Sequence, residues 1–380
     1  MLSQKTEQIV GSIVDIMFVV SEMMERFYAE RNHSYNTRLA YNTSVQHFEK
    51  VTGQRIDDMI HIAKEEKKHD WESTHLRQWL IIYRNWNYDQ FNENTAKSNI
   101  DRVKTVFKHY NIRVDDLPYF STKQARKSEI IDYEDLPNRE MLKRAIEVKN
   151  PLLKAMTLFM SSTGLSRIDT FNLTIQDYLT STYEYHHSNN IYDAIKIMDE
   201  SELSVVPVFK LPRRKTGETY RTFASPESVK AINNYLLSRD YLENHYPLFG
   251  ISFSYFNELF RNTNDKLGFG RINGVSRFSP QMLRSYHASQ LAEAGMNDSL
   301  IDLLQGRKPQ SIARRHYIRV KREKLKEEYI RCLPWLVVED VEQIKTENDI
   351  LKEENAELKK TREKLDDLIH RMDLLEQKGE

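Results

Sequence analysis

The segment SPQMLRSYHASQLAEAG (residues 279–295) reads as one helix with signals at both ends. Ser279 is a typical N-cap, Pro280 suits the first helical position, where its missing N–H goes unused, and a glycine closes the segment. Gln281 and Arg284 stand three residues apart and therefore share a face of this helix. Both side chains can donate hydrogen bonds to an oxyanion such as a phosphate.

The sequence before this helix mixes helix and strand. LLKAMTLFMSSTGLS (152–166) predicts a buried helix that runs into a glycine turn. SVVPVF (204–209) and TYRTFA (219–224) read as two strands around the basic turn RRKTG. They predict a hairpin with Lys215 at its tip.

The sequence after it continues with short helices. DSLIDLLQG (298–306) predicts a helix that Gly306 ends, and Pro309 can then open a last helix carrying Tyr317. Residues 139–333 are therefore expected to form one mixed α/β domain within a mainly α-helical chain.

The first part of the chain is predicted to be helical. Residues 1–33 read as a helical lead-in, and residues 34–120 as a helical domain of the core-binding type, with an N-cap at Ser34. A helix over 94–112 has one apolar face and an opposite face with Lys97, Lys104 and Lys108. We expect this cationic stripe to lie against phosphates, although an ordinary solvated helix face has the same pattern.

Residues 121–138 are polar, then basic, then acidic, and they read as the linker between the two domains. Its basic side chains are further candidates for DNA contact. They are Lys123, Arg126 and Lys127.

Composition restricts the function classes. The chain has 380 residues, 39% hydrophobic and 29% charged, so it can bury a core in two or three domains. The single cysteine, Cys332, excludes an internal disulfide and a cysteine zinc site, which fits a reducing cytoplasm. The most apolar stretch, residues 9–20, is too short to span a bilayer and contains Asp15, so we expect no membrane segment.

The net charge of zero hides an asymmetry. Residues 336–380 hold 14 acidic and 8 basic residues, so the rest of the chain carries a net positive charge. A basic body is weak evidence for a nucleic-acid partner.

Five segments, taken together, resemble the tyrosine recombinases, the phage-integrase family. In chain order they are TGLSRIDTFNLT (163–174), RRKTG (213–217), QMLRSY (281–286), LLQGR (303–307) and HY (316–317). The last two are similar to the archaeal integrases of that family. Each segment alone is a weak signal, and their order and spacing carry the resemblance.

The resemblance implies a role for each matching residue. Arg167 and Arg284 match the two arginines that clamp the scissile phosphate, for which a planar guanidinium is well suited. Lys215 matches the general acid that protonates the leaving 5′ oxygen. Tyr317 matches the nucleophile that forms a 3′-phosphotyrosine bond, which needs no metal, ATP or other cofactor. Arg314 and Lys321 flank it at helical spacing and favour its ionised form.

Three positions depart from the family pattern. Gln281 stands where a histidine is usual, and it can bond phosphate but cannot shuttle a proton at neutral pH. Arg307 stands where histidine or tryptophan is usual, and it can still donate to phosphate. Arg167 falls one residue later than the bacterial arginine, and Ser166 takes that slot. If Tyr317 is not the nucleophile, Tyr286 and Tyr329 are the next candidates.

The last part of the chain carries a heptad pattern. Val337, Ile344, Leu351, Leu358, Leu365 and Met372 occupy one repeating position, and Asn348 and Asn355 occur at the other. Such asparagines specify a parallel dimer, so residues 336–378 predict a coiled coil. The resemblance further implies four protomers acting on two double-stranded DNA duplexes.

Two alternatives remain at the level of sequence. A basic run before a zipper suggests a bZIP-like transcription factor, but Pro334 should break the continuous helix that such a protein needs. A catalytically silent DNA-binding protein of the recombinase fold is the other. We therefore expect a recombinase, and we expect that removing residues 336–380 spares DNA cleavage.

Overall fold

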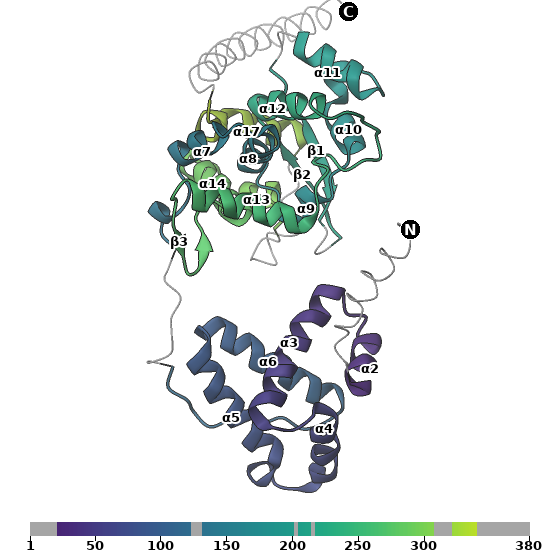
Figure 1. Cartoon of the computed structure of the whole chain (residues 1–380), viewed down its shortest axis with the longest axis vertical. Coiled ribbons are helices and arrows are strands. Elements are labelled where there is room, and N and C mark those ends of the chain that lie inside the picture. The colour runs from purple at the N-terminus through teal and green to yellow at the C-terminus, as the bar shows by residue number, and fades with distance from the viewer. Residues whose placement is uncertain (1–20, 123–130, 201–203, 214–216, 308–320, 340–380) are drawn as a thin grey trace, which may run out of the picture. The chain divides into compact units, whose positions relative to one another are not determined.

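The computed structural model describes residues 21–122, 131–200, 204–213, 217–307 and 321–339 (Figure 1). The chain forms two compact units, Met1–Glu129 and Ile130–Glu380. Two predicted catalytic positions, Lys215 and Tyr317, lie outside the described residues, and so do Lys123, Arg126 and Lys127.

The first unit is helical in its described part. Its helices are α2 (Glu22–Glu30), α3 (Tyr35–Thr52), α4 (Ile56–Glu65), α5 (His75–Gln90) and α6 (Glu93–His109), with short 3₁₀ turns at Glu66–Lys68 and Trp71–Ser73. Helix α3 begins as predicted, because the Ser34 side chain accepts a hydrogen bond from the Thr37 amide. It ends at Gly53, whose φ of 69° is the left-handed cap that glycine favours.

Helix α2 shows that the predicted lead-in is part of this unit. Met24, Phe27 and Tyr28 are buried in the same core as α3 to α6. The Tyr28 hydroxyl also donates to Asn42 Oδ1 of α3, at 2.5 Å. The described end of the lead-in therefore packs as a core helix.

The second unit contains most of the remaining elements. Its helices are α7 (Arg139–Ile146), α8 (Pro151–Thr163), α9 (Arg167–Phe171), α10 (Ile175–His186), α11 (Ile191–Glu200), α12 (Pro226–Leu237), α13 (Phe253–Lys266), α14 (Pro280–Glu293), α15 (Asp298–Leu304) and α17 (Arg322–Leu336), with a 3₁₀ turn at Tyr133–Asp135. Within the described ranges no helix is long and apolar enough to span a bilayer.

Helix α8 is the centre of the second unit. Nearly all of its residues are buried, and it packs against α7, α12 and α14 (Figure 1). The glycine turn predicted after it is present, because Gly164 caps the helix with a φ of 62°. This buried helix holds the turn that leads to α9 and Arg167.

Two hairpins complete the unit. Strands β1 (Val208–Pro212) and β2 (Thr219–Phe223) pair antiparallel, with Val208 opposite Phe223. The predicted hairpin is thus present, but its first strand starts later than the predicted 204–209. Pro207 explains the shift, because proline has no N–H for the ladder. Strands β3 (Arg271–Ile272) and β4 (Val275–Ser276) form the small second hairpin.

The predicted helix at 279–295 is confirmed as α14. The Ser279 side chain accepts from the Met282 amide, Pro280 is the first helical residue, and Gly295 follows with a φ of 78°. Helix α15 ends just before Gly306, which has a φ of 60°.

The predicted linker is partly absorbed into the second unit. The guanidinium of Arg277 donates to the Asp135 carbonyl at 2.9 Å, and the Tyr133 hydroxyl donates to Glu293 at 2.6 Å. Residues 132–138 therefore pack against this unit and do not behave as a free connection.

The end of α17 corrects two predictions. Pro334 does not break the helix; it lies in the last turn, and the helix continues to Leu336. A proline is costly in a helix interior, but only two helical residues follow it here. Leu336, Val337 and Val338 are fully buried in the second unit. Val337 is therefore a core residue, and the predicted coiled coil cannot begin at residue 336.

A buried carboxylate fixes this last described stretch. Glu227 in the first turn of α12 is 3% exposed, and it accepts the backbone amides of Val338 at 2.8 Å and Glu339 at 2.8 Å. A deletion from residue 336 would remove this packing, so a deletion that spares the domain must start after Glu339. Residues 340–378 of the predicted coiled coil lie outside the described residues.

Candidate active site

The turn between α8 and α9 presents Arg167. The Ser166 side chain caps α9 by accepting from the Asp169 amide, and Arg167 is the first helical residue. The Arg167 guanidinium is exposed, donates to Asn257 Oδ1 at 2.6 Å, and lies 4.6 Å from the centre of the Phe253 ring. Side chains of α13 thus hold Arg167 in place.

Arg167 and Gln281 line one hollow of about 450 Å³. Arg261 of α13, Ser276 of β4 and the first turn of α14 complete its polar wall. Gln281 is exposed at the second position of α14 and lines the hollow together with Ser279 and Pro280. The hollow can therefore accept an anion between Arg167 and α14.

Arg284 lies one turn further along α14 in a different setting. It is 4% exposed, and its guanidinium donates to the carbonyls of Gly164 and Gln305, each at 2.6 Å. Burial, and then the nearby Arg307 cation, lower the pKa of Arg284 to about 10. The side chain stays charged at neutral pH and joins the turn before Arg167 to the end of α15.

Gln305 and His287 form a second layer behind Arg284. The Gln305 amide donates to the Arg284 carbonyl at 2.9 Å and to His287 Nδ1 at 3.0 Å. Burial, and then the cations of Arg284 and Arg307, lower the pKa of His287 to about 3. A side chain on Gly164 would overlap the His287 ring, so glycine is needed there both for its φ and for this approach.

The first hairpin closes on the same centre. Arg213 donates to the Gly306 carbonyl, and the Tyr220 ring covers Gly306 so closely that an added Cβ would lie 2.8 Å from it. The Tyr220 hydroxyl donates to Asp169 Oδ2 of α9 at 3.3 Å. Burial raises the pKa of Tyr220, with the Asp169 carboxylate adding to the effect. The hairpin base, α9 and the α15 end are thereby fixed around Arg284.

Arg307 follows this centre directly and is exposed. Its backbone amide donates to the Asp302 carbonyl at 2.8 Å, which closes the end of α15. Its cation is near enough to lower the pKa of both Arg284 and His287. The Arg284 guanidinium also bonds the carbonyl of Gln305, two residues before Arg307, so both arginines lie at the end of α15.

The two fallback tyrosines are unsuitable nucleophiles. Tyr286 is 1% exposed and Tyr329 is fully buried. Burial raises the pKa of Tyr286 to about 12, and it raises the pKa of Tyr329 well above its usual value. Neither phenol can meet a phosphate or ionise readily, so Tyr317 stays the candidate nucleophile.

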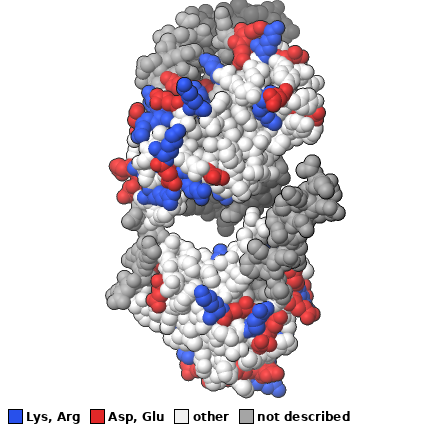
Figure 2. Space-filling view, viewed as in Figure 1, with Lys and Arg blue, Asp and Glu red and all other residues white. Residues whose placement is uncertain are grey.

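The predicted cationic stripe lies on α6 of the first unit. Ile100, Val103 and Phe107 face the core, and Lys97 and Lys108 are exposed on the other side, with Lys104 partly exposed. Figure 2 shows Lys and Arg side chains interspersed with acidic ones on the described surface of both units. The face in view therefore has no large field of one sign.

Sequence reasoning missed the residues that hold the arginines. Asn257 and Phe253 lie outside the five matching segments. His287 directly follows one of them, and Gln305 lies within LLQGR, but neither had been given a role. The glycines at 164 and 306 were the available signal, because each marks a place where another side chain approaches the backbone. In the described part of the chain, three metal-binding side chains of the His, Cys, Asp or Glu type nowhere come together.

The comparisons with known proteins agree on the kind of fold. Residues 258–335 match the family described as archaeal phage integrase. The Tn1549 transposon integrase, solved in complex with circular intermediate DNA, covers 82% of this chain and 98% of its own length at 13% identity, with a TM-score of 0.50. Among curated proteins no sequence matches this chain.

Two other solved structures align over similar lengths. The XerA recombinase covers 81% of this chain and 95% of its own length at 19% identity, with a TM-score of 0.34. The XerH recombinase bound to difH covers 85% and 88% at 12% identity, with a TM-score of 0.45. The fold assignment rests on the Tn1549 integrase. A two-unit fold of this kind also excludes the bZIP-like alternative. The chain therefore has the tyrosine recombinase fold, and its residues 258–335 are similar to archaeal phage integrases.

Proposed function

We propose that this protein is a site-specific recombinase that cuts and rejoins double-stranded DNA. The observation that carries the proposal is the convergence of three separate segments on Arg284 of α14. Its guanidinium bonds the turn before Arg167 and the end of α15 before Arg307, and the base of the first hairpin closes over the same point. A phosphodiester group needs such a concentration of fixed cations in the transition state.

The reaction follows from the roles of the side chains. The Tyr317 phenol gives up its proton to the solvent, and its oxygen attacks the scissile phosphorus and forms a P–O bond, while the bond from phosphorus to the 5′ oxygen breaks. Lys215 supplies the proton to that leaving 5′ oxygen. Arg167, Arg284 and Arg307 neutralise the charge on the non-bridging oxygens, and Gln281 donates a neutral hydrogen bond beside them. The phosphotyrosine conserves the bond energy for the reverse step.

The assembly and biological role extend this proposal. DNA contacts would come from Lys97, Lys104 and Lys108 of α6 and from the basic side chains at 123–127. Four protomers would act on two duplexes, with residues 340–378 pairing protomers as parallel coiled coils. We propose the integration or excision of a mobile element as the biological outcome, in the cytoplasm where the DNA lies.

The experiment is covalent capture on a nicked suicide duplex taken from the DNA that flanks the gene. The parent protein should form a covalent protein–DNA adduct in EDTA and without ATP. Tyr317→Phe should bind the duplex within about twofold of the parent, because only the attacking oxygen is lost, and should form no adduct. Tyr192→Phe, which changes an exposed tyrosine of α11, is the matched control and should behave like the parent.

The outcomes separate the alternatives. A parent protein that binds the duplex but never forms an adduct would be the catalytically silent DNA binder. An adduct that survives in Tyr317→Phe would place the nucleophile elsewhere. A strict need for a divalent cation on a short linear duplex would contradict the mechanism.

A further inference from the structure

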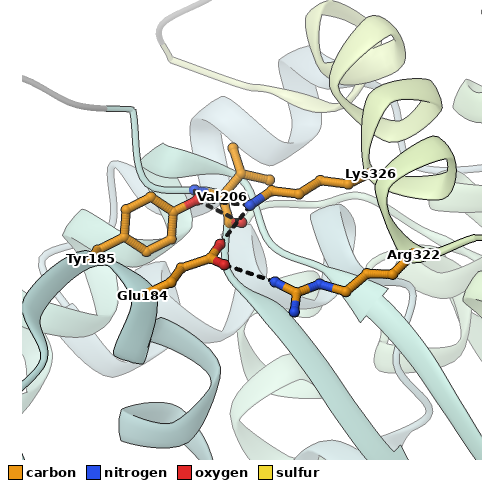
Figure 3. Close-up of polar contacts among 5 residues, drawn as sticks. All are labelled: Glu184, Tyr185, Val206, Arg322 and Lys326. Carbon is orange, nitrogen blue, oxygen red and sulfur yellow. Dashed lines mark hydrogen bonds and ion pairs between the residues drawn. The ribbon is translucent and has the colours of Figure 1, made fainter.

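One polar cluster joins three segments of the second unit and includes neither Arg284 nor the residues bonded to it (Figure 3). It consists of Glu184 and Tyr185 near the end of α10, Val206 just before β1, and Arg322 and Lys326 in the first turns of α17. We call it the Glu184 cluster. None of its residues belongs to a motif of the recombinase resemblance.

The carboxylate of Glu184 holds two cations of α17, Arg322 and Lys326. Its Oε2 accepts from Arg322 Nη2 at 2.7 Å, and its Oε1 accepts from Lys326 Nζ at 2.6 Å. Burial opposes the ionised carboxylate, but the Lys326 and Arg322 cations outweigh it and lower the pKa of Glu184. The carboxylate is thus charged at neutral pH and ties the start of α17 to α10.

The hydroxyl of Tyr185 extends the tie to the hairpin. It donates to the Val206 carbonyl at 3.1 Å and accepts the Val206 amide at 3.2 Å. It also accepts from Lys326 Nζ at 3.0 Å, so its hydrogen-bonding capacity is used in full. A tyrosine hydroxyl that bonds both backbone groups of one residue fixes that residue closely, and the residue here lies two positions before the start of β1.

The positions of Arg322 and Val206 in the chain connect the Glu184 cluster to the two segments that carry Tyr317 and Lys215. Arg322 follows Tyr317 by five residues, so at most ~18 Å of extended backbone separates them. Val206 precedes the strand whose turn carries Lys215. The cluster therefore joins the C-terminal base of the tyrosine segment to the base of the hairpin that carries the lysine.

We propose that Glu184 and Tyr185 are positioning residues that set the nucleophile and the general acid relative to each other. The inference rests on the proposed function. In the displacement, the attacking phenol and the leaving 5′ oxygen stand on opposite sides of the phosphorus, so Tyr317 and Lys215 must keep a fixed separation. Glu184 acts on the tyrosine side of this arrangement, and Tyr185 acts mainly on the lysine side.

If the Glu184 cluster only stabilised the fold, its loss should lower the free energy of unfolding. The side chains of Glu184, Arg322 and Lys326 are 39%, 46% and 22% exposed, and ion pairs that water still reaches contribute about 1 kcal/mol or less to global stability. Removing the Glu184 charge should therefore leave thermal unfolding nearly unchanged. A change in cleavage rate without a change in stability or DNA affinity is the signature of positioning.

The first test replaces Glu184 by its uncharged isostere. Glu184→Gln should lower the cleavage rate constant at saturating nicked duplex about tenfold, because small displacements of a reacting group cost that much or more. The dissociation constant for DNA should stay within about twofold. Arg322→Gln should give the same result from the other partner. Glu328→Gln is the matched control, since it breaks the 3.0 Å ion pair to Arg331 within α17 and does not touch α10.

The second test separates the two sides of the cluster. A duplex with sulfur at the bridging 5′ position has a leaving group that needs no general acid. Tyr185→Phe, which frees the hairpin base, should be slow on the oxygen substrate and largely restored on sulfur. Glu184→Gln should remain about tenfold slow on both substrates, because its defect lies with the nucleophile.

The outcomes distinguish this inference from the proposed function. If the parent protein forms no adduct, the proposed function fails. If the parent forms the adduct and Glu184→Gln, Arg322→Gln and Tyr185→Phe all cleave like it, the inference alone is wrong. It is equally wrong if these variants lose activity together with folding or DNA binding. It is also wrong if the sulfur substrate restores the cleavage rate of both Glu184→Gln and Tyr185→Phe, or of neither.

Discussion

Arg284 and Arg167 are the same side chain in opposite settings. Arg284 is 4% exposed, and two backbone carbonyls fix it. Arg167 is exposed, and it rests on the Asn257 amide and the Phe253 ring. Arg284 is therefore both a framework residue and a catalytic candidate, whereas Arg167 is a surface side chain that α13 orients and on which the fold does not depend. Substitution of Arg284 should therefore lower both activity and stability, whereas substitution of Arg167 should lower activity alone.

Arg284→Ala should give the largest effect. It leaves the buried carbonyls of Gly164 and Gln305 without their donors, which costs about 2–6 kcal/mol of unfolding free energy at about 1–3 kcal/mol for each group. Cleavage should fall by about 10³-fold or more. Urea unfolding and adduct kinetics measure the two quantities. A variant that unfolds at the same urea concentration as the parent would contradict the framework role.

Arg167→Ala should lose activity without losing stability. Cleavage should drop by about 10²–10³-fold, since one donor to the transition state is removed. The free energy of unfolding should change by no more than about 0.5 kcal/mol, as expected for an exposed side chain. Paired measurement with Arg284→Ala is the sharpest form of the comparison. An equal loss of unfolding free energy in both variants would contradict the difference between the two arginines.

His287→Gln tests the layer behind Arg284 through pH. The pKa of His287 is about 3 in the folded chain and its ordinary value is 6.5. Between these pH values the unfolded chain therefore binds a proton at His287 and the folded chain does not. The neutral form favours folding above pH 6.5, and that contribution is lost as the pH falls toward 3. The parent should lose up to about 1.4 kcal/mol per pH unit more than His287→Gln in this window.

Chemical denaturation at several pH values between 7 and 4 gives this difference. Subtraction of the variant removes the other histidines with lowered pKa, such as His33, His47 and His186, which both proteins share. Parallel curves for parent and variant would show that His287 is not the group responsible.

Asn257→Ala should have the smallest effect. It removes the 2.6 Å contact that orients Arg167 but leaves the Phe253 ring in place. A single hydrogen bond of about 0.5–1.5 kcal/mol corresponds to a two- to tenfold slower cleavage at unchanged stability. Adduct kinetics beside those of Arg167→Ala measure it. A loss as large as that of Arg167→Ala would mean that the amide itself contacts the DNA.

Local signals explain what the sequence could predict. Ser279 and Pro280 define the start of α14 within a few residues, so the helix and its Gln281 and Arg284 could be placed without tertiary information. The turn after α8 could be predicted in the same way, because the chain takes a left-handed φ at Gly164 and glycine favours it.

Contacts between distant segments explain what it could not. The Gln305 amide meets Arg284 and His287 only because α15 folds back on α14. Val337 fits a heptad repeat as well as it fits a core, and only the packing against the second unit decides between them. A hydrophobic period records which residues avoid water but does not specify which surface covers them.

The Glu227 anchor has a mechanical consequence. A force applied to residues beyond 339 is carried first by the amides of Val338 and Glu339 and by the buried valines, and not by the start of α17. If protomers are joined through the residues after 339, the pulling force should act on the contacts of Glu227 and not on the residues around Arg284. For the same reason, a fluorescent protein or surface tether attached after Glu339 gives a handle for single-molecule pulling. A break at the anchor should then appear as a separate extension step before the domain unfolds.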